Sequence, residues 1–250
     1  MNPIESRPHD PPPKTVWRVR KTLVLLLSCA AGSIDAASYI GLGHVFAANM
    51  TGNTVHLGMA TGYGSLVDIG HSGSALLGFL LGVAIGASIV ERDDSPTPWP
   101  RAVNVALVCE LILLAVTAAI WAAAGAMSPS TTDGLLLALG LAMGMQSVTV
   151  RRLRIPGVAS TYLTGTLTAL TAGLVRVALG RRTPAPEAPT HGSVLMASVW
   201  AIYGGGAVIT TLVSPHGGAR ALVLPLALIA IVLVAGDRES GWPIPGTRSA

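Results

Sequence analysis

Two carboxylic acids lie inside long apolar segments of this sequence. Asp35 is in the middle of the segment 22–42, and Glu110 lies in the segment 102–126. A carboxylate inside a membrane helix costs about 2.5–3.5 kcal/mol on insertion scales and commonly has a function, whereas the protonated acid is cheaper to bury. We therefore predict Asp35 and Glu110 as proton-coupling residues. The alternative for each is a purely structural role, as a hydrogen-bonded acid inside a helix bundle.

Two further apolar segments carry clusters of hydroxyl and amide side chains. The segments 45–62 and 157–179 each contain a Thr-Gly pair. Threonine can cap the N-terminus of a helix, glycine permits close approach of another chain, and helix N-termini carry partial positive charge. Two such helix starts inside a membrane predict a site for a small polar or anionic solute. The predicted solute-binding residues are Asn49, Thr51, Gly52, Asn53, Gln146, Thr164, Gly165 and Thr166.

Sequence motifs for catalysis and metal binding are missing from the chain. It contains no Walker loop, HExxH or GxSxG motif, so we expect neither an enzyme nor a bound cofactor. His44 and His56 flank the first polar segment without other ligands at metal-binding spacing. Cys29 and Cys109 lie inside apolar segments, so the cysteines predict no disulfide framework and no metal site.

The composition is typical of a membrane protein. Hydrophobic residues make up 51% of the chain, charged residues only 11%, and the mean hydropathy is +0.61, whereas a soluble domain carries about a quarter charged residues. The net charge of +4 comes from basic residues at the ends of apolar segments, where the positive-inside rule places them. We therefore expect membrane lipids and a small solute as partners, and no nucleic acid. Homo-oligomer formation is left open.

Eight apolar segments are candidates for membrane helices, which need about 20 residues to cross a bilayer core. If 45–62 and 157–179 are re-entrant or broken helices, six spans remain, and all of the 16 basic residues except Arg220 lie on the side of the N-terminus. If all eight segments cross, Arg92, Arg101 and other basic residues move to the opposite side. The positive-inside rule favours six spans with both termini cytosolic. The eight segments are 22–42, 45–62, 74–90, 102–126, 134–150, 157–179, 193–213 and 219–235.

The two halves of the chain contain similar features in the same order. This order indicates an internal duplication, although the identities are few enough to arise by chance. With three spans in each half, the halves have opposite orientations in the membrane. Gly78, Gly82 and Gly86 also recur at four-residue spacing and predict a close helix–helix contact. The matching positions are Thr51-Gly52 with Thr164-Gly165, Val45 with Val158, Leu57 with Leu170, Gly32 with Gly144, and Gly82 and Gly86 with Gly204 to Gly206.

The sequence thus predicts an all-α, polytopic helical membrane protein in four regions. Residues 1–21 contain five prolines and five basic residues, and this composition predicts a disordered cytosolic tail. The segments 22–126 and 134–235 form the two inverted repeats of the membrane domain. Residues 236–250 form a second cytosolic tail.

The first polar segment and the helix before it carry motifs of a known family. They read Gly32-Ser33-Ile34-Asp35-Ala36, then Phe46, then Met50-Thr51-Gly52-Asn53. This pattern of Gly-x-x-Asp-Ala, Phe and Met-Thr-Gly-Asn resembles the YoaK-type family of bacterial membrane proteins.

The second half extends the resemblance. The family pattern of a Gln followed by Thr-x-Leu-Thr-Gly-Thr corresponds to Gln146 and to residues 161–166, with Ser147 at a position where the family has Asn. The resemblance covers roughly residues 22–235. It implies a multi-pass protein of the bacterial cytoplasmic (inner) membrane and implies no activity.

These observations favour a secondary transporter or permease for a small polar or anionic solute, coupled to protons through Asp35. A passive channel or facilitator with the same lining is one alternative. A second is a non-transporting membrane scaffold, in which threonine hydroxyls bond to carbonyls of their own helix and the glycines only pack against neighbours.

Overall fold

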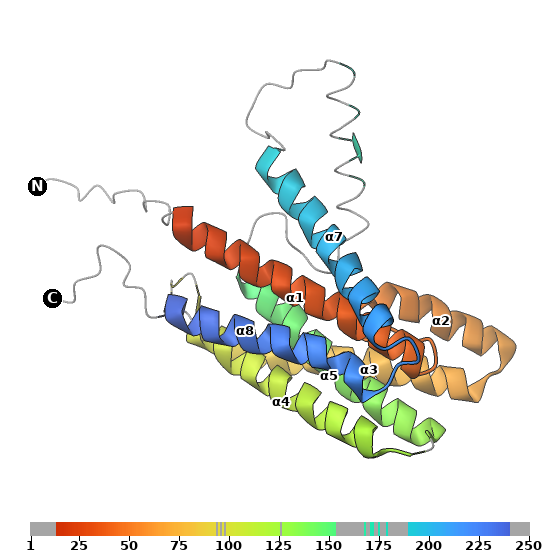
Figure 1. Cartoon of the computed structure of the whole chain (residues 1–250). Coiled ribbons are helices and arrows are strands. Elements are labelled where there is room, and N and C mark those ends of the chain that lie inside the picture. Colours follow the sequence, from red (N-terminus) through yellow and green to blue (C-terminus); the bar gives the residue numbers. More distant parts are fainter. Residues whose placement is uncertain are drawn as a thin grey trace, which may run out of the picture.

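The structure, a computed structural model, describes residues 14–93, 95, 97, 99–125, 127–153, 168, 171–172, 175, 179 and 190–240. Within these ranges it contains seven α-helices and one 3₁₀-helix (Figure 1). The helices are α1 (Lys14–Gly41), α2 (Met50–Tyr63), α3 (Leu66–Val90), α4 (Arg101–Ala123), α5 (Pro129–Arg152), α7 (Thr190–Val213), η1 (Ala219–Leu222) and α8 (Val223–Ser240).

Six helical stretches are long and apolar enough to cross a membrane: α1 from Arg18, α3, α4, α5, α7 from Val194, and η1 with α8 as far as Gly236. Their outward faces carry exposed large apolar side chains such as Leu80 and Ile112. By contrast, α2 has 14 residues and is therefore about 21 Å long, too short for a bilayer core of about 30 Å. The six predicted spans are thus confirmed as helices. The predicted segment 157–179 lies largely outside the described residues.

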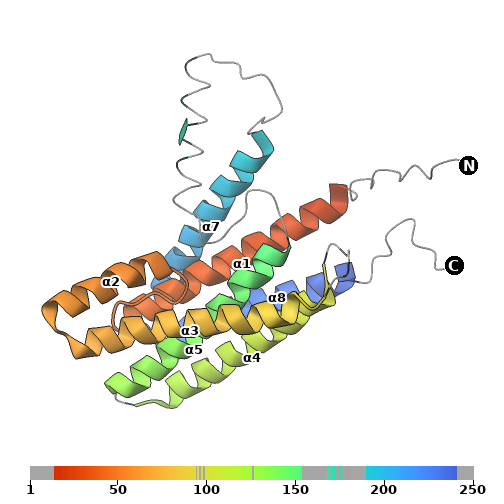
Figure 2. The same ribbon diagram turned by 180° about the vertical axis from the view of Figure 1, so that it is seen from behind.

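The axes of five spanning helices are roughly aligned, with chains running in both senses, and α7 crosses α1 at a steep angle (Figures 1 and 2). The beginnings of α1 and α4 and the ends of α3 and α8 lie at one end of the molecule. The connections α2–α3, α4–α5 and α7–α8 lie at the other end. The most extensive helix pairs are α3 with α5 and α1 with α7.

The pair α3–α5 packs through glycines on both helices. A side-chain carbon on Gly78 or Gly82 would lie 2.1 or 2.0 Å from the backbone carbonyl oxygen of Leu137 or Leu141 on α5. In the opposite direction, a side-chain carbon on Gly144 would lie 2.2 Å from the carbonyl oxygen of Phe79 on α3. The predicted glycine contact is therefore confirmed, and α5 contributes glycines of its own.

The pair α1–α7 uses the same kind of contact. A side-chain carbon on Gly32 would lie 2.0 Å from the carbonyl oxygen of Tyr203, and one on Gly206 would lie 2.2 Å from that of Cys29. The Ser33 hydroxyl also donates to the Gly206 carbonyl at 3.2 Å. Small residues let both pairs of helix backbones approach to direct contact, which is the main source of helix association in lipid.

Arginine side chains link helix termini at the end of the molecule where α1 begins. Arg20 of α1 donates to the carbonyl of Leu153 at the end of α5. Arg152 of α5 donates to the carbonyls of Val90, at the end of α3, and Asp93. Cations in these positions satisfy carbonyls that lack an intrahelical partner and complement the helix dipole.

The Asp93 carboxylate joins the same network from the connection between α3 and α4. It accepts from the backbone N–H groups of Ser95 at 3.0 Å and of Ala102 at 3.2 Å, the latter in the first turn of α4. Hydrogen bonds from the Ser95 side chain and from these two N–H groups lower the pKa of Asp93, with a smaller contribution from Arg152. The connection is therefore tied to three helices.

Helix α1 begins at Lys14, within the tail that the composition predicts to be disordered. All five prolines of that tail precede Lys14, so residues 14–21 contain no helix breaker and extend the apolar helix that follows. The tail prediction therefore extends eight residues too far.

The arrangement of helix ends leads to a prediction about orientation. Most described basic residues, including Arg92 and Arg101, lie at the end where α1 begins, so we expect that end to be cytosolic. In a background without Cys29 and Cys109, Thr97→Cys should resist an impermeant thiol reagent in intact cells. Gly125→Cys, at the opposite end, should react. The reverse pattern would contradict this orientation.

Candidate functional site

Between α1 and α2 the chain turns back into the helix bundle. Gly43 (φ +77°) and His44 (φ +61°) adopt left-handed conformations that reverse its direction. A side-chain carbon on Gly43 would also lie 2.7 Å from the His71 ring of α3, so both the conformation and the space require glycine there. Val45 and Ala47, which follow, are buried.

Asp35 fixes this turn to two helices. Its Oδ1 accepts from the backbone N–H groups of Ala47 at 2.8 Å and Ala48 at 2.6 Å, and its Oδ2 accepts from the Tyr203 hydroxyl of α7. Asp35 is only 3% exposed. Because it precedes Gly41, the last residue of α1, by six positions, the turn reaches about 9 Å back along that helix.

Two asparagines determine where α2 begins. Asn49 is the N-cap, and its side chain accepts from the Gly52 N–H at 3.3 Å. The buried Asn53 side chain accepts from the Phe46 N–H at 2.9 Å and donates to the Phe46 carbonyl at 2.6 Å. The predicted threonine cap is therefore wrong: Thr51 is the second residue of the helix, because Asn49 takes the capping position.

Aromatic rings cover the outside of the turn. Phe46 stacks on Tyr39 with ring centroids 4.9 Å apart, and His44 and His56 pack edge-on against Tyr39 and Phe46 respectively. A side-chain carbon on Gly52 would lie 3.1 Å from the Phe46 ring, so glycine allows α2 to approach the turn closely. The two histidines thus take part in packing here.

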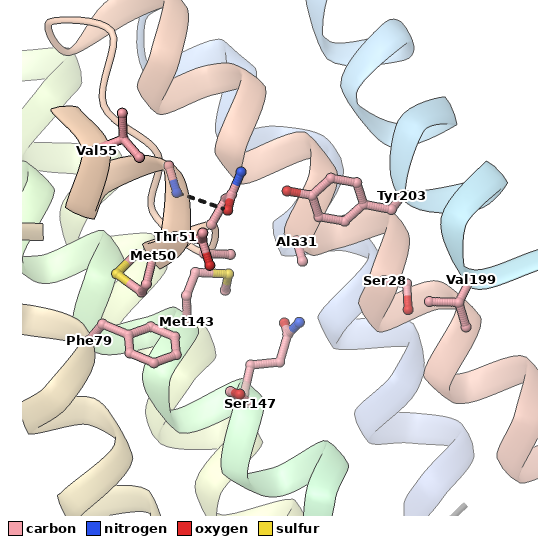
Figure 3. A pocket seen from close by; sticks show the side chains of 14 residues that line it. Ser28, Ala31, Met50, Thr51, Val55, Phe79, Met143, Ser147, Val199 and Tyr203 are labelled. Atoms are coloured by element: carbon pink, nitrogen blue, oxygen red, sulfur yellow. Dashed lines mark hydrogen bonds between the residues drawn. The ribbon is translucent and has the colours of Figure 1, made fainter. Parts of the chain in front are cut away.

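A cavity of about 390 Å³ lies between this turn and the helices α1, α2, α3, α5 and α7 (Figure 3). Figure 3 shows Tyr203 reaching from α7 toward Thr51 at the start of α2, with Met143 and Phe79 on the other side. The lining combines hydroxyl and amide groups with a larger apolar wall. Its residues are Ser28, Ala31, Ala48, Asn49, Met50, Thr51, Gly52, Val55, Phe79, Met143, Gln146, Ser147, Val199 and Tyr203.

The cavity lies at mid-depth in the bundle. Ala31, Phe79 and Tyr203 each lie near the middle of the spanning part of α1, α3 and α7. The N-terminus of α2 therefore lies beside the cavity at mid-depth along the bundle. A helix N-terminus at this depth presents N–H donors and partial positive charge to the cavity.

Gln146 is the most deeply buried amide of the lining, at 4% exposed. Its Nε2 donates to the carbonyl of Leu27 on α1 at 3.0 Å. Its Oε1 has no hydrogen-bond partner within the described part of the chain. A buried acceptor without a donor is costly, which marks this atom as available to a ligand.

Four predicted solute-binding residues, Asn49, Thr51, Gly52 and Gln146, line the same cavity although Gln146 is far from the others in sequence. Asn53 does not line it, because its side chain is used on Phe46. Thr164, Gly165 and Thr166 lie outside the described residues.

Several lining residues were not predicted from the sequence, above all Tyr203. A tyrosine in the middle of an apolar segment, next to the glycines 204–206, is a signal that its hydroxyl needs a buried partner. Ser147, noted only as a departure from the family pattern, also lines the cavity. The apolar residues Phe79, Met143 and Val199 give no such signal, since they look like ordinary span residues.

Glu110 lies apart from this site. It is fully buried on α4, and neither carboxyl oxygen has a hydrogen-bond partner within the described residues. It does not line the cavity. Its proton-coupling role stays a prediction.

The comparison with known proteins agrees with this architecture. Residues 23–235 match a protein family described as "Protein of unknown function (DUF1275)". The chain is also 37% identical over 230 residues to the UPF0700 transmembrane protein YoaK of Bacillus subtilis (strain 168), an alignment that covers 91% of this chain and 99% of that protein. The chain belongs to the DUF1275 family. No solved structure matches it.

As a member of the DUF1275 family, the protein is an integral, multi-pass membrane protein. The described motifs that carry the resemblance meet at the cavity, whereas the motif at residues 161–166 lies outside the described residues. Asp35 of the Gly-x-x-Asp-Ala motif holds the turn, the Met-Thr-Gly-Asn run forms the first turn of α2, and Gln146 faces them from α5. These described motifs therefore form one structural unit in this protein.

Proposed function

We propose that this protein is a permease that carries a small polar solute across the membrane, with the 390 Å³ cavity as its binding site. The proposal is carried by one observation: α2 begins at mid-depth in the bundle, where its residue Thr51 and Gln146 of α5 line the same cavity. In transporters, solute sites near the bilayer midplane are commonly formed by such discontinuous helices.

The path of residues 42–63 supports this proposal as a re-entrant element. The chain leaves α1 at Gly41, passes inward to Asp35, and then returns outward as α2 to the end of the molecule where α1 finishes. Irregular backbone is tolerated at membrane depth only where it is buried in protein or lines a cavity. Both conditions hold here, because Ala47 is buried and Ala48 lines the cavity.

Equivalent glycine contacts support an inverted repeat. Gly82 contacts the carbonyl of Leu141 as Gly206 contacts that of Cys29. Gly144 contacts Phe79 as Gly32 contacts Tyr203. Cys29 and Leu141 are separated by the same number of residues as Gly32 and Gly144. Likewise, the separation of Gly82 and Gly206 equals that of Phe79 and Tyr203. In this proposal α1–α7 and α5–α3 are symmetry-related pairs, and their rocking alternately exposes the cavity.

Asp35 gives the proposal a means of proton coupling. Its carboxylate holds Ala48 of the turn and Tyr203 of α7, which both line the cavity. Proton uptake would convert an acceptor of three hydrogen bonds into a group that also donates, and would therefore loosen one wall. A passive channel would not need this change, and a scaffold would not need the cavity.

Access to the cavity from both sides of the membrane tests the proposal without a known substrate. In a chain lacking Cys29 and Cys109, Ser147→Cys places a thiol on the cavity wall. An impermeant thiol reagent should modify it both in intact cells and in inside-out vesicles. For a proton-coupled carrier, a pH gradient should change the two rates in opposite directions, whereas in a channel it should leave their ratio unchanged.

Ser72→Cys is the matched control, because Ser72 is buried on α3 and does not line the cavity. It should remain unmodified in both preparations. Modification of Ser147→Cys from one side only, or from neither, would overturn the permease proposal.

A further inference from the structure

The orientation of the Gln146 amide is fixed by its partner. Only its NH₂ group can donate to the Leu27 carbonyl. The amide oxygen, Oε1, is therefore the atom that does not face Leu27. Oε1 is then the polar atom of this side chain that has no hydrogen-bond partner within the described part of the chain. A ligand that satisfies it must supply a hydrogen-bond donor.

At the start of α2, by contrast, the ligand must supply a hydrogen-bond acceptor. The Thr51 N–H, in the first turn, makes no hydrogen bond within the described part of the chain, and the Thr51 hydroxyl is likewise unbonded there. N–H groups at a helix N-terminus recognise an acceptor. A ligand therefore needs an acceptor toward Thr51 and a donor toward Gln146.

The charges around the cavity select against an ion. None of the 14 described residues that line it is acidic, basic or a histidine. The partial positive charge at the start of α2 is opposed by the Asp35 carboxylate, which binds the N–H groups of Ala47 and Ala48 just before the N-cap. Among the described residues an anion would thus meet no full positive charge, and the apolar wall of Phe79, Met143 and Val199 favours an uncharged body.

We propose that the cavity binds small uncharged molecules in which an N–H donor adjoins a carbonyl acceptor, as in a primary carboxamide with a compact apolar body. This inference rests on the proposed function only in treating the cavity as the solute site. It narrows the predicted "polar or anionic" solute to an uncharged one.

Three probes of nearly the same shape test this ligand class. Benzamide carries both donor and acceptor, acetophenone has a methyl group in place of the NH₂ group and carries the acceptor alone, and benzoate is the matched anion. Each is added to the purified protein carrying Ser147→Cys, and protection of that thiol from modification is measured. Benzamide should protect at a concentration at least about tenfold lower than either other probe, since one net hydrogen bond is worth roughly this factor.

Gln146→Met serves as the matched variant, because it keeps the side-chain length and removes the acceptor. It should reduce the preference for benzamide over acetophenone to about one. The three-probe comparison uses the chain with Gln146 intact, so it decides the question even if the variant does not fold. Preference for benzoate, or no protection by benzamide, would overturn the inference.

The two proposals can fail separately. Benzamide protection together with access from one side only would leave a binding site without transport. Access from both sides together with preference for benzoate would leave a permease with a different solute class.

Discussion

Asp35→Leu should produce little folded protein, and what folds should unfold at a markedly lower temperature than the unaltered chain. The substitution leaves two backbone N–H groups, of Ala47 and Ala48, and the Tyr203 hydroxyl without their acceptor. Hydrogen bonds to a charged group are worth about 1.5–3 kcal/mol each. Losing three approaches the whole stability of an ordinary protein, about 5–15 kcal/mol. The measurements are the yield of monodisperse protein in detergent and its unfolding temperature.

Two matched variants separate the parts of this effect. Tyr203→Phe removes one hydrogen bond and should cost much less. Asp35→Asn can still accept from both N–H groups and can donate to the Tyr203 oxygen, so it should fold. If Asp35 couples transport to protons, Asp35→Asn should also abolish the pH-gradient effect on modification of Ser147→Cys. Normal stability of Asp35→Leu would show that Asp35 does not hold the turn.

The spans could be predicted from the sequence because their signal is local. A run of about 20 apolar residues must be helical in a membrane, whatever its neighbours are. The shortness of α2 follows from the polar residues between Asn49 and His56, which are too polar for a full span. The spans and the short α2 can therefore each be predicted from the residues of a single segment.

The details of the site depend on contacts between distant residues, so the sequence alone did not predict them. Asp35 and Tyr203 are 168 positions apart, and neither segment indicates the other as its partner. The start of α2 also depends on a distant contact, because Asp35 holds the turn that places Asn49 at the N-cap. Similarly, the sequence shows that Gln146 is polar but not that Leu27 orients its amide.

The glycine contacts give the second large effect. Gly82→Ala and Gly206→Ala should each lower the unfolding temperature strongly, because the added carbon would lie 2.0 Å from the Leu141 carbonyl oxygen and 2.2 Å from that of Cys29. Backbone atoms cannot move aside as a flexible side chain does, so the helices must separate. Overpacking of this kind costs typically 1–3 kcal/mol or more.

Each helix supplies its own control for this prediction. A side-chain carbon on Gly73 of α3 or on Gly204 of α7 would meet nothing within 4 Å among the described residues, so alanine there should be tolerated. If the two helix pairs are related by an inverted repeat, Gly82→Ala and Gly206→Ala should also lower the unfolding temperature by similar amounts. A severe effect at Gly82 with none at Gly206 would mean that α1–α7 does not pack as α3–α5 does. The rocking of two equivalent pairs around the cavity would then lose its physical basis.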